Sequence, residues 1–123
     1  MPTVRVCTNV SQKDLPKDFL ADLLAQLAKS LKRDASHITL HFLCDQLLVR
    51  GTAGDPMCYV EVFNSSGHGD AEEIREKVIG VSSFLKGALN ITDGEMIQVL
   101  FHVIPPHQVG IGTGKILTDF MKS

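Results

Sequence analysis

The sequence predicts a single α+β domain over residues 1–123, with a four-stranded sheet and two helices on one of its faces. Three observations support this prediction. A strand-like, a helix-like and a second strand-like segment follow one another twice along the chain, as in a doubled β-α-β element. The chain of 123 residues is long enough for one core but short for two. Apolar residues make up 44% of it, so we expect extra apolar surface to be hidden in an oligomer.

The first β-α-β unit begins with a strand at 2–8, where Val4 and Val6 alternate with residues for the opposite face. A helix is predicted from about 16 to 32, because apolar residues recur there at four-residue steps and form a stripe. The second strand is predicted at 37–44, with every other residue apolar and facing inward.

The second unit repeats this order after a loop rich in glycine and proline. Its first strand is predicted at about 58–64. A helix is predicted from Asp70 to about Leu89, since Asp70 followed by Glu73 has the spacing of a capping box. The fourth strand is predicted at 96–103 and is followed by a short tail.

The sheet face turned away from the helices is predicted to be neither a dry core nor a plain solvated surface. A second layer from neighbouring subunits around a wet axis would suit such a face. The mixed set on it comprises Thr3, Arg5, His37, Thr39, His41, Tyr59, Glu61, Gln98, Leu100 and His102.

Composition excludes several classes of protein. A net charge of −2 provides no basic surface for nucleic acid or an anionic membrane. No segment approaches a membrane-spanning length and the N-terminus lacks the features of a signal peptide, so we expect synthesis in the cytosol. Three widely spaced cysteines, Cys7, Cys44 and Cys58, are expected to be buried, reduced thiols.

Neither a metal nor a nucleotide cofactor is predicted. His37 and His41 share one predicted strand, but four residues separate them by about 13 Å, too far for joint coordination. The motif "GIGTG" at 110–114 lacks the spacing of a nucleotide loop, and we expect a C-terminal turn there.

Two residues leave a functional and an ordinary interpretation open. If Met1 is removed, Pro2 carries a secondary amine that can act as a base; if Met1 stays, Pro2 is a stiff residue at the start of a strand. Arg33 at the end of the first helix is either a solvated charge or an anchor for a substrate carboxylate.

Short motifs spread over the chain help to decide between these interpretations. They are "TNV" at 8–10, "FL" at 19–20, "DQL" at 45–47, "DP" at 55–56, "SSG" at 65–67, "LNI" at 89–91, and "VG" at 109–110 followed by "GTG". Together with the Pro2 start, their order resembles the macrophage migration inhibitory factor and D-dopachrome tautomerase family along essentially the whole chain. The segment "HQVGIGTGKILTDF" resembles the dopachrome branch more than the other.

The resemblance implies a doubled β-α-β fold of the ferredoxin-like kind, assembled as a homotrimer around a solvent channel. It implies that Met1 is removed and that Pro2, in a pocket between subunits, is the general base of a keto–enol tautomerase. The implied substrates are small aromatic compounds such as phenylpyruvate or dopachrome, and no cofactor is needed. Family members also act outside cells as cytokine-like ligands of cell-surface receptors, leaving the cytoplasm without a signal peptide.

The family's site is only partly retained. Arg33 stands where the family usually has a lysine, and Ser65-Ser66 replaces a Ser-Ile pair, so one apolar wall becomes polar at Ser66. His37 replaces an aromatic residue near the first helix, and Val109 is retained as a wall of the pocket.

Gln98 and Leu100 stand where the migration-inhibitory branch has a tyrosine and an asparagine contributed by the neighbouring subunit. These replacements favour an alternative, a trimeric signalling ligand with a vestigial pocket, whereas Pro2 and Arg33 favour the enzyme. A plain ferredoxin-like structural module does not explain the Pro2 start together with the order of the motifs.

Overall fold

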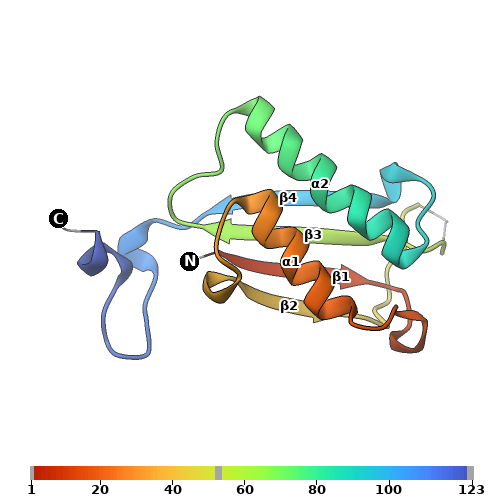
Figure 1. Ribbon diagram of the computed structural model, residues 1–123, viewed down its shortest axis with the longest axis horizontal. Coiled ribbons are helices and arrows are strands. Elements are labelled where there is room, and N and C mark those ends of the chain that lie inside the picture. Colours follow the sequence, from red (N-terminus) through yellow and green to blue (C-terminus); the bar gives the residue numbers. More distant parts are fainter. Residues whose placement is uncertain (1, 52–53, 122–123) are drawn as a thin grey trace.

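The computed structural model describes residues 2–51 and 54–121, in which two helices cover one face of a four-stranded sheet (Figure 1), as predicted. The elements in chain order are β1 (Thr3–Thr8), α1 (Phe19–Leu31), β2 (Thr39–Leu43), β3 (Cys58–Asn64), α2 (Ala71–Leu89) and β4 (Ile97–Val103). No helix in this described part of the chain is both long and apolar enough to cross a membrane.

The sheet has the strand order β2-β1-β3-β4. Strands β1 and β2, joined through α1, are parallel neighbours, and so are β3 and β4, joined through α2. The two units meet where β1 pairs antiparallel with β3. As a consequence, the starts of β1 and β2 lie at the same end of the sheet as the ends of β3 and β4.

The core lies between the helices and the sheet, where both periodicities place apolar residues. Every second residue of β1 and β3 meets one stripe of each helix, which confirms the predicted inward face. The most deeply buried side chains are Val4, Val6, Leu23, Leu27, Val60, Val62, Val81 and Leu85.

Helix α1 begins three residues later than predicted. Asp18 has a φ of 60°, in the left-handed region, so the residues before Phe19 cannot continue the helix. The Phe19 amide still bonds to the Pro16 carbonyl at 3.2 Å, which makes the predicted first turn a separate turn. At the other end, Lys32 has a φ of 54° and ends the helix.

Helix α2 begins with the predicted capping box. The Asp70 carboxylate accepts from the Glu73 amide at 2.9 Å, and the Glu73 carboxylate accepts from the Asp70 amide at 3.3 Å. Gly80 and Gly87 lie inside the helix without interrupting it. At Gly80 the helix comes close to α1, since an added Cβ would lie 2.6 Å from Ser30 Oγ.

The chain after β4 projects beyond the end of the sheet at which the N-terminus lies (Figure 1). The predicted turn at 110–114 is confirmed: the Gly114 amide bonds to the Ile111 carbonyl at 2.8 Å, and Gly110 forms a bridge with Ile116. The three cysteines are free thiols, as expected; Cys7 and Cys58 are buried, whereas Cys44 is only half-buried.

Candidate active site at one end of the sheet

Pro2, the predicted catalytic base, is buried immediately before β1. Its carbonyl oxygen accepts a hydrogen bond from the Thr39 amide at 3.1 Å, which fixes it against the start of β2. Residue 1 lies outside the described residues, so the removal of Met1 and a free imino nitrogen on Pro2 stay predictions. Burial is the environment that favours a neutral amine, because desolvation disfavours the charged form.

The strand register places other predicted site residues at the same end of the sheet as Pro2. Thr3 pairs with Thr39 of β2 on one side and with Phe63 of β3 on the other. The turn that precedes β2 and the loop that follows β3 therefore lie at the same end of the sheet as Pro2 (Figure 1). These two segments contain His37 and Ser66.

Arg33 and Ser66 are in contact. Arg33 Nη2 donates a hydrogen bond to Ser66 Oγ at 3.3 Å, and both side chains are exposed. Arg33 is positioned by the end of α1, since its amide bonds to the Ala28 carbonyl at 3.1 Å after the left-handed Lys32. A guanidinium and a hydroxyl side by side both donate to a carboxylate. Their role in binding substrate stays a prediction.

His37 is not in a strand, contrary to the prediction. It is the exposed last residue of a short 3-10 turn, Ala35–His37, which precedes β2. The Asp34 carboxylate caps this turn, accepting from the Ser36 amide at 2.9 Å and from the Ser36 hydroxyl at 2.8 Å. These hydrogen bonds lower the pKa of Asp34, and the bond from the Ser36 amide has the larger effect.

Val109 lies in the segment that follows β4. It is half-buried after the short turn Pro106–Gln108, and its carbonyl accepts from the Leu117 amide at 2.9 Å. Val109 therefore belongs to the segment that leaves the sheet at the Pro2 end, where β4 ends. Its role as a pocket wall stays a prediction.

Gln98 and Leu100 do not join Pro2 within one chain. Gln98 is in register with Tyr59, which pairs in turn with Cys7 of β1. The five-residue step from Cys7 back to Pro2 spans about 16 Å of extended strand. Leu100 lies two residues further along β4 and is 37% exposed.

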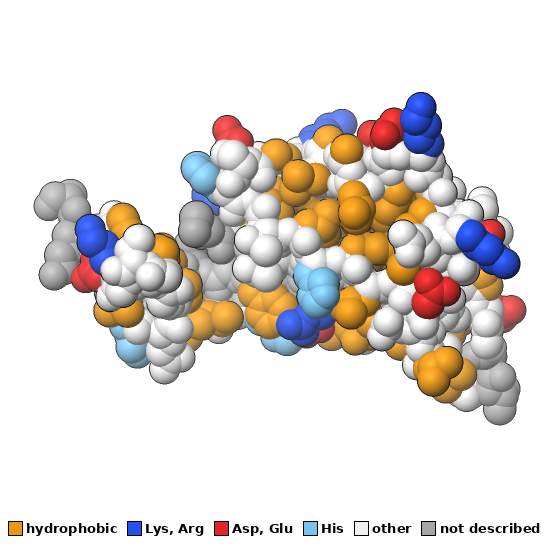
Figure 2. Space-filling model, turned by 90° about the horizontal axis from the view of Figure 1, so that it is seen from below, with side chains coloured by type: hydrophobic (Ala, Val, Ile, Leu, Met, Phe, Trp, Pro, Cys, Tyr) orange, Lys and Arg blue, Asp and Glu red, His pale blue; other side chains and the backbone are white. Residues whose placement is uncertain are grey.

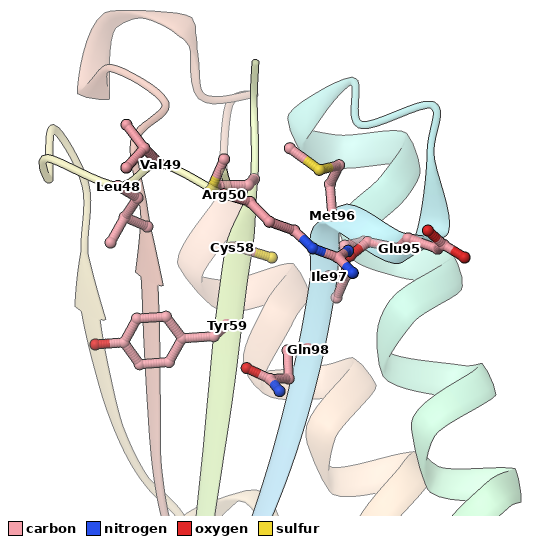
Figure 3. Close-up of a pocket in the computed structure, with 10 residues that line it drawn as sticks. Leu48, Val49, Arg50, Cys58, Tyr59, Glu95, Met96, Ile97 and Gln98 are labelled. Carbon is pink, nitrogen blue, oxygen red and sulfur yellow. The ribbon is translucent and has the colours of Figure 1, made fainter. Parts of the chain in front are cut away.

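Gln98 instead lines a cavity of about 560 Å³ at the opposite end of the sheet (Figure 3). Leu48 and Val49, from the segment after β2, form one side of it. Arg50 reaches across towards β4, where its guanidinium donates to the Glu95 carbonyl. One chain therefore separates the predicted site residues between two ends of its sheet.

Comparisons with known proteins agree with this fold. A family model described as macrophage migration inhibitory factor (MIF) matches residues 1–118. MIF from Xenopus tropicalis is 32% identical over 110 residues, covering 89% of this chain and 94% of the relative. A MIF-like protein from Caenorhabditis elegans is 29% identical, covering 89% and 90%. This chain belongs to the MIF family.

Solved structures of MIF proteins share the fold. MIF from Trichinella spiralis has a TM-score of 0.81 at 22% identity and covers 93% of this chain and 98% of its own. The MIF homologue from Prochlorococcus marinus has a TM-score of 0.78 at 22% identity, with 94% and 98% covered. Such identities show the fold alone, and membership of the MIF family supports a cytokine or tautomerase function in general.

The open sheet face of this MIF-family chain has the predicted mixed character. The Glu61 carboxylate lies between two basic side chains, 3.4 Å from Arg5 Nη1 and 3.1 Å from His102 Nε2. The rings of Phe63 and His102 stack with their centroids 4.5 Å apart. The cluster is largely polar and its charged groups are paired, which suits a face that meets water or another subunit.

His68, beside the candidate site, was not predicted as a site residue. It is buried in the loop between β3 and α2, and its ring bonds to β4. A histidine between two glycines of a loop was the available signal, but nothing local shows that its ring turns inward. Among residues 2–51 and 54–121, no three His, Cys, Asp or Glu side chains are grouped so that they could hold a metal ion.

Proposed function

We propose that this MIF-family chain is a keto–enol tautomerase of the phenylpyruvate or dopachrome type, with Pro2 as general base. The observation that supports it is the arrangement at one end of the sheet, where a buried Pro2 shares that end with the Arg33–Ser66 pair. With Met1 removed, the imino nitrogen takes the proton of an enol hydroxyl and returns a proton to the other carbon of the enol double bond, C3. The keto form results, and no cofactor is consumed.

Arg33 is the carboxylate anchor in this proposal, and Ser66 is the polar wall beside it. A 2-oxo acid held by its carboxylate presents C3, the carbon beyond its carbonyl carbon, to a base at a defined distance. His37 and Val109 border the same end of the sheet and would shape the pocket there.

We propose a homotrimer in which each site is completed by the next subunit's Gln98 and Leu100. Within one chain these residues are far from Pro2, so only a second copy brings them to it. Large apolar side chains left exposed by the single chain support such an assembly, among them Leu47, Val49, Val103, Phe120 and Met121. From the β2 side, Figure 2 shows hydrophobic side chains over much of the surface rather than an even cover of charges. A monomeric mass in sedimentation experiments would contradict this assembly.

The test of the base compares wild type with Pro2→Gly. We expect wild type to convert enol-phenylpyruvate and dopachrome methyl ester, followed by absorbance, and Pro2→Gly to lose most of this rate. Intact-mass measurement is a necessary companion, since a retained Met1 would block the imino nitrogen and refute the mechanism. Equal rates for both proteins would also refute it.

The test of the anchor compares Arg33→Met with Arg75→Met. Arg75 is exposed on α2 and pairs with Glu72, so its replacement removes the same charge outside the site. A charge-assisted hydrogen bond contributes about 1.5–3 kcal/mol, so Arg33→Met should raise KM by about tenfold or more. Arg75→Met should leave KM unchanged; equal effects of both variants would show only a general charge effect.

A second candidate function is supported by Leu100, which offers no hydrogen bond where the resemblance indicates a polar partner. In this alternative the trimer is a cytokine-like ligand of a cell-surface receptor, made in the cytoplasm and secreted without a signal peptide, and its pocket is vestigial. It predicts uncatalysed rates for wild type and Pro2→Gly alike, together with specific binding of the labelled trimer to cells.

A further inference from the structure

His68 is a buried polar residue that the proposed reaction does not use. It lies between β3 and α2, and its side chain is among the few buried polar ones, 6% exposed. Its Nε2 atom is 2.7 Å from the His102 carbonyl oxygen of β4. A carbonyl only accepts, so Nε2 carries the proton in this contact. The ring also meets the Phe101 ring edge-on, with centroids 5.0 Å apart.

The backbone of His68 is attached to the other neighbouring element. Its carbonyl accepts a hydrogen bond from Lys77 Nζ of α2 at 2.6 Å. One residue thus connects the loop to both β4 and α2. The residues on either side, Gly67 and Gly69, have φ values of 83° and 99°, a conformation that glycine adopts freely. Because both flanking residues are glycines, these attachments help to hold the shape of the loop.

The same loop positions Ser66. The Asn64 side-chain amide donates to the Gly67 carbonyl at 2.9 Å, so the backbone around Ser66 is held from one side. His68 holds it from the other side, two residues beyond Ser66. The Ser66 hydroxyl is the group that accepts from Arg33 Nη2.

We propose that His68 is a positioning residue for substrate binding. Its ring, in the tautomer that has hydrogen on Nε2, anchors the loop at 65–69 to β4. Ser66 and Arg33 therefore stay together and bind the substrate carboxylate as a pair. This proposal rests on the proposed function only in naming that carboxylate. It assigns His68 no contact with the reacting atoms.

The proposal distinguishes substrate binding from proton transfer. Ser66 and Arg33 would hold the carboxylate equally in the bound substrate and in the transition state, and such uniform binding is expressed in KM. Pro2, attached to β2 rather than to this loop, would keep its position. Loss of the His68 anchor is therefore expected to raise KM and to leave kcat nearly unchanged.

Two substitutions separate the hydrogen bond from the packing of the ring. His68→Phe keeps a ring against Phe101 but removes the donor to the His102 carbonyl. His68→Gln loses the ring but keeps an amide donor at a similar reach. We expect KM for phenylpyruvate to rise about fivefold in His68→Phe, the effect of one net hydrogen bond, with kcat within about twofold, and KM near wild type in His68→Gln.

A second measurement keeps the proposal independent of the enzyme activity. Hydrogen exchange of the amides at 65–67, followed by mass spectrometry without substrate, should be about fivefold faster in His68→Phe than in wild type and His68→Gln. If wild type fails to tautomerise any acid tested, the proposed function fails. The carboxylate is then tested as phenylpyruvate binding by NMR titration, with the same order of the variants expected.

Three outcomes would overturn the proposal. The first is a folded His68→Phe with unchanged exchange and unchanged substrate affinity. The second is faster exchange with unchanged affinity, which would show that the loop does not position the carboxylate. The third is His68→Gln as impaired as His68→Phe. If His68→Phe does not fold, Lys77→Met, which releases the His68 carbonyl, takes its place and is expected to raise KM in the same direction.

Discussion

Two glycines of α2 provide a matched test of how this helix packs against α1, the helix that precedes Arg33. A Cβ atom added at Gly80 would lie 2.6 Å from Ser30 Oγ and 3.4 Å from Gln26 Nε2, both on α1. Ser30 Oγ accepts a hydrogen bond from Gln26 Nε2 at 2.8 Å, so turning it away from the new Cβ would break that bond. At Gly87, by contrast, an added Cβ has no described heavy atom within 4 Å.

The magnitude follows from two opposing effects. Replacing glycine by alanine inside a helix stabilises it by about 1 kcal/mol. Overpacking in a tight contact costs about 1–3 kcal/mol. Gly87→Ala should therefore raise the free energy of unfolding by about 1 kcal/mol, and Gly80→Ala should lower it by up to about 2 kcal/mol. Ser30→Ala removes the obstructing oxygen, so adding Gly80→Ala to that background should become stabilising.

The assay is urea denaturation followed by circular dichroism, at one protein concentration because an oligomer's stability depends on it. The decisive comparison is the sign of the Gly80→Ala effect with and without Ser30→Ala. If Gly80→Ala stabilises wild type as much as Gly87→Ala does, the close approach of α1 and α2 is wrong. The position of Arg33, which follows the end of α1, would then have to be reconsidered.

Other predictions concern caps and thiols. Asp70→Ala should lower the free energy of unfolding by about 1 kcal/mol in urea denaturation, through loss of the capping box; no change would contradict that role. Burial raises the pKa of Cys58 to about 12, so iodoacetamide at pH 8 should modify it only after denaturation, as mass spectrometry would show. Hydrogen bonds from Ser36 lower the pKa of Asp34 in the folded protein. Its stabilisation is therefore complete above the unfolded pKa of about 3.9 and is lost as the pH falls through the folded value. Asp34→Asn should be less stable than wild type at pH 6, and a difference that persists unchanged at pH 2 would refute this.

Local patterns predicted the elements because burial repeats with the period of each element. The four-residue steps of α1, the alternation of β1 and the acid at Asp70 all depend on neighbours close in the chain. The predicted start of α1 was wrong because the left-handed conformation of Asp18 cannot be recognised from the pattern of apolar residues. The prediction that His37 lies in a strand was wrong for a similar reason. Asp34 caps a short turn at Ala35–His37, so the strand begins after it.

The amino-acid sequence by itself determined the doubled β-α-β order and the inward faces of its strands and helices. It also identified Pro2 as a candidate base and Arg33 as a candidate carboxylate anchor. Only the tertiary structure decided which of them meet. The antiparallel pairing of β1 with β3 brings Ser66 to Arg33 at the Pro2 end, and it leaves Gln98 at the other end of the sheet. Periodicity reports burial within one segment, whereas strand direction and register depend on contacts between distant segments, which no local pattern contains.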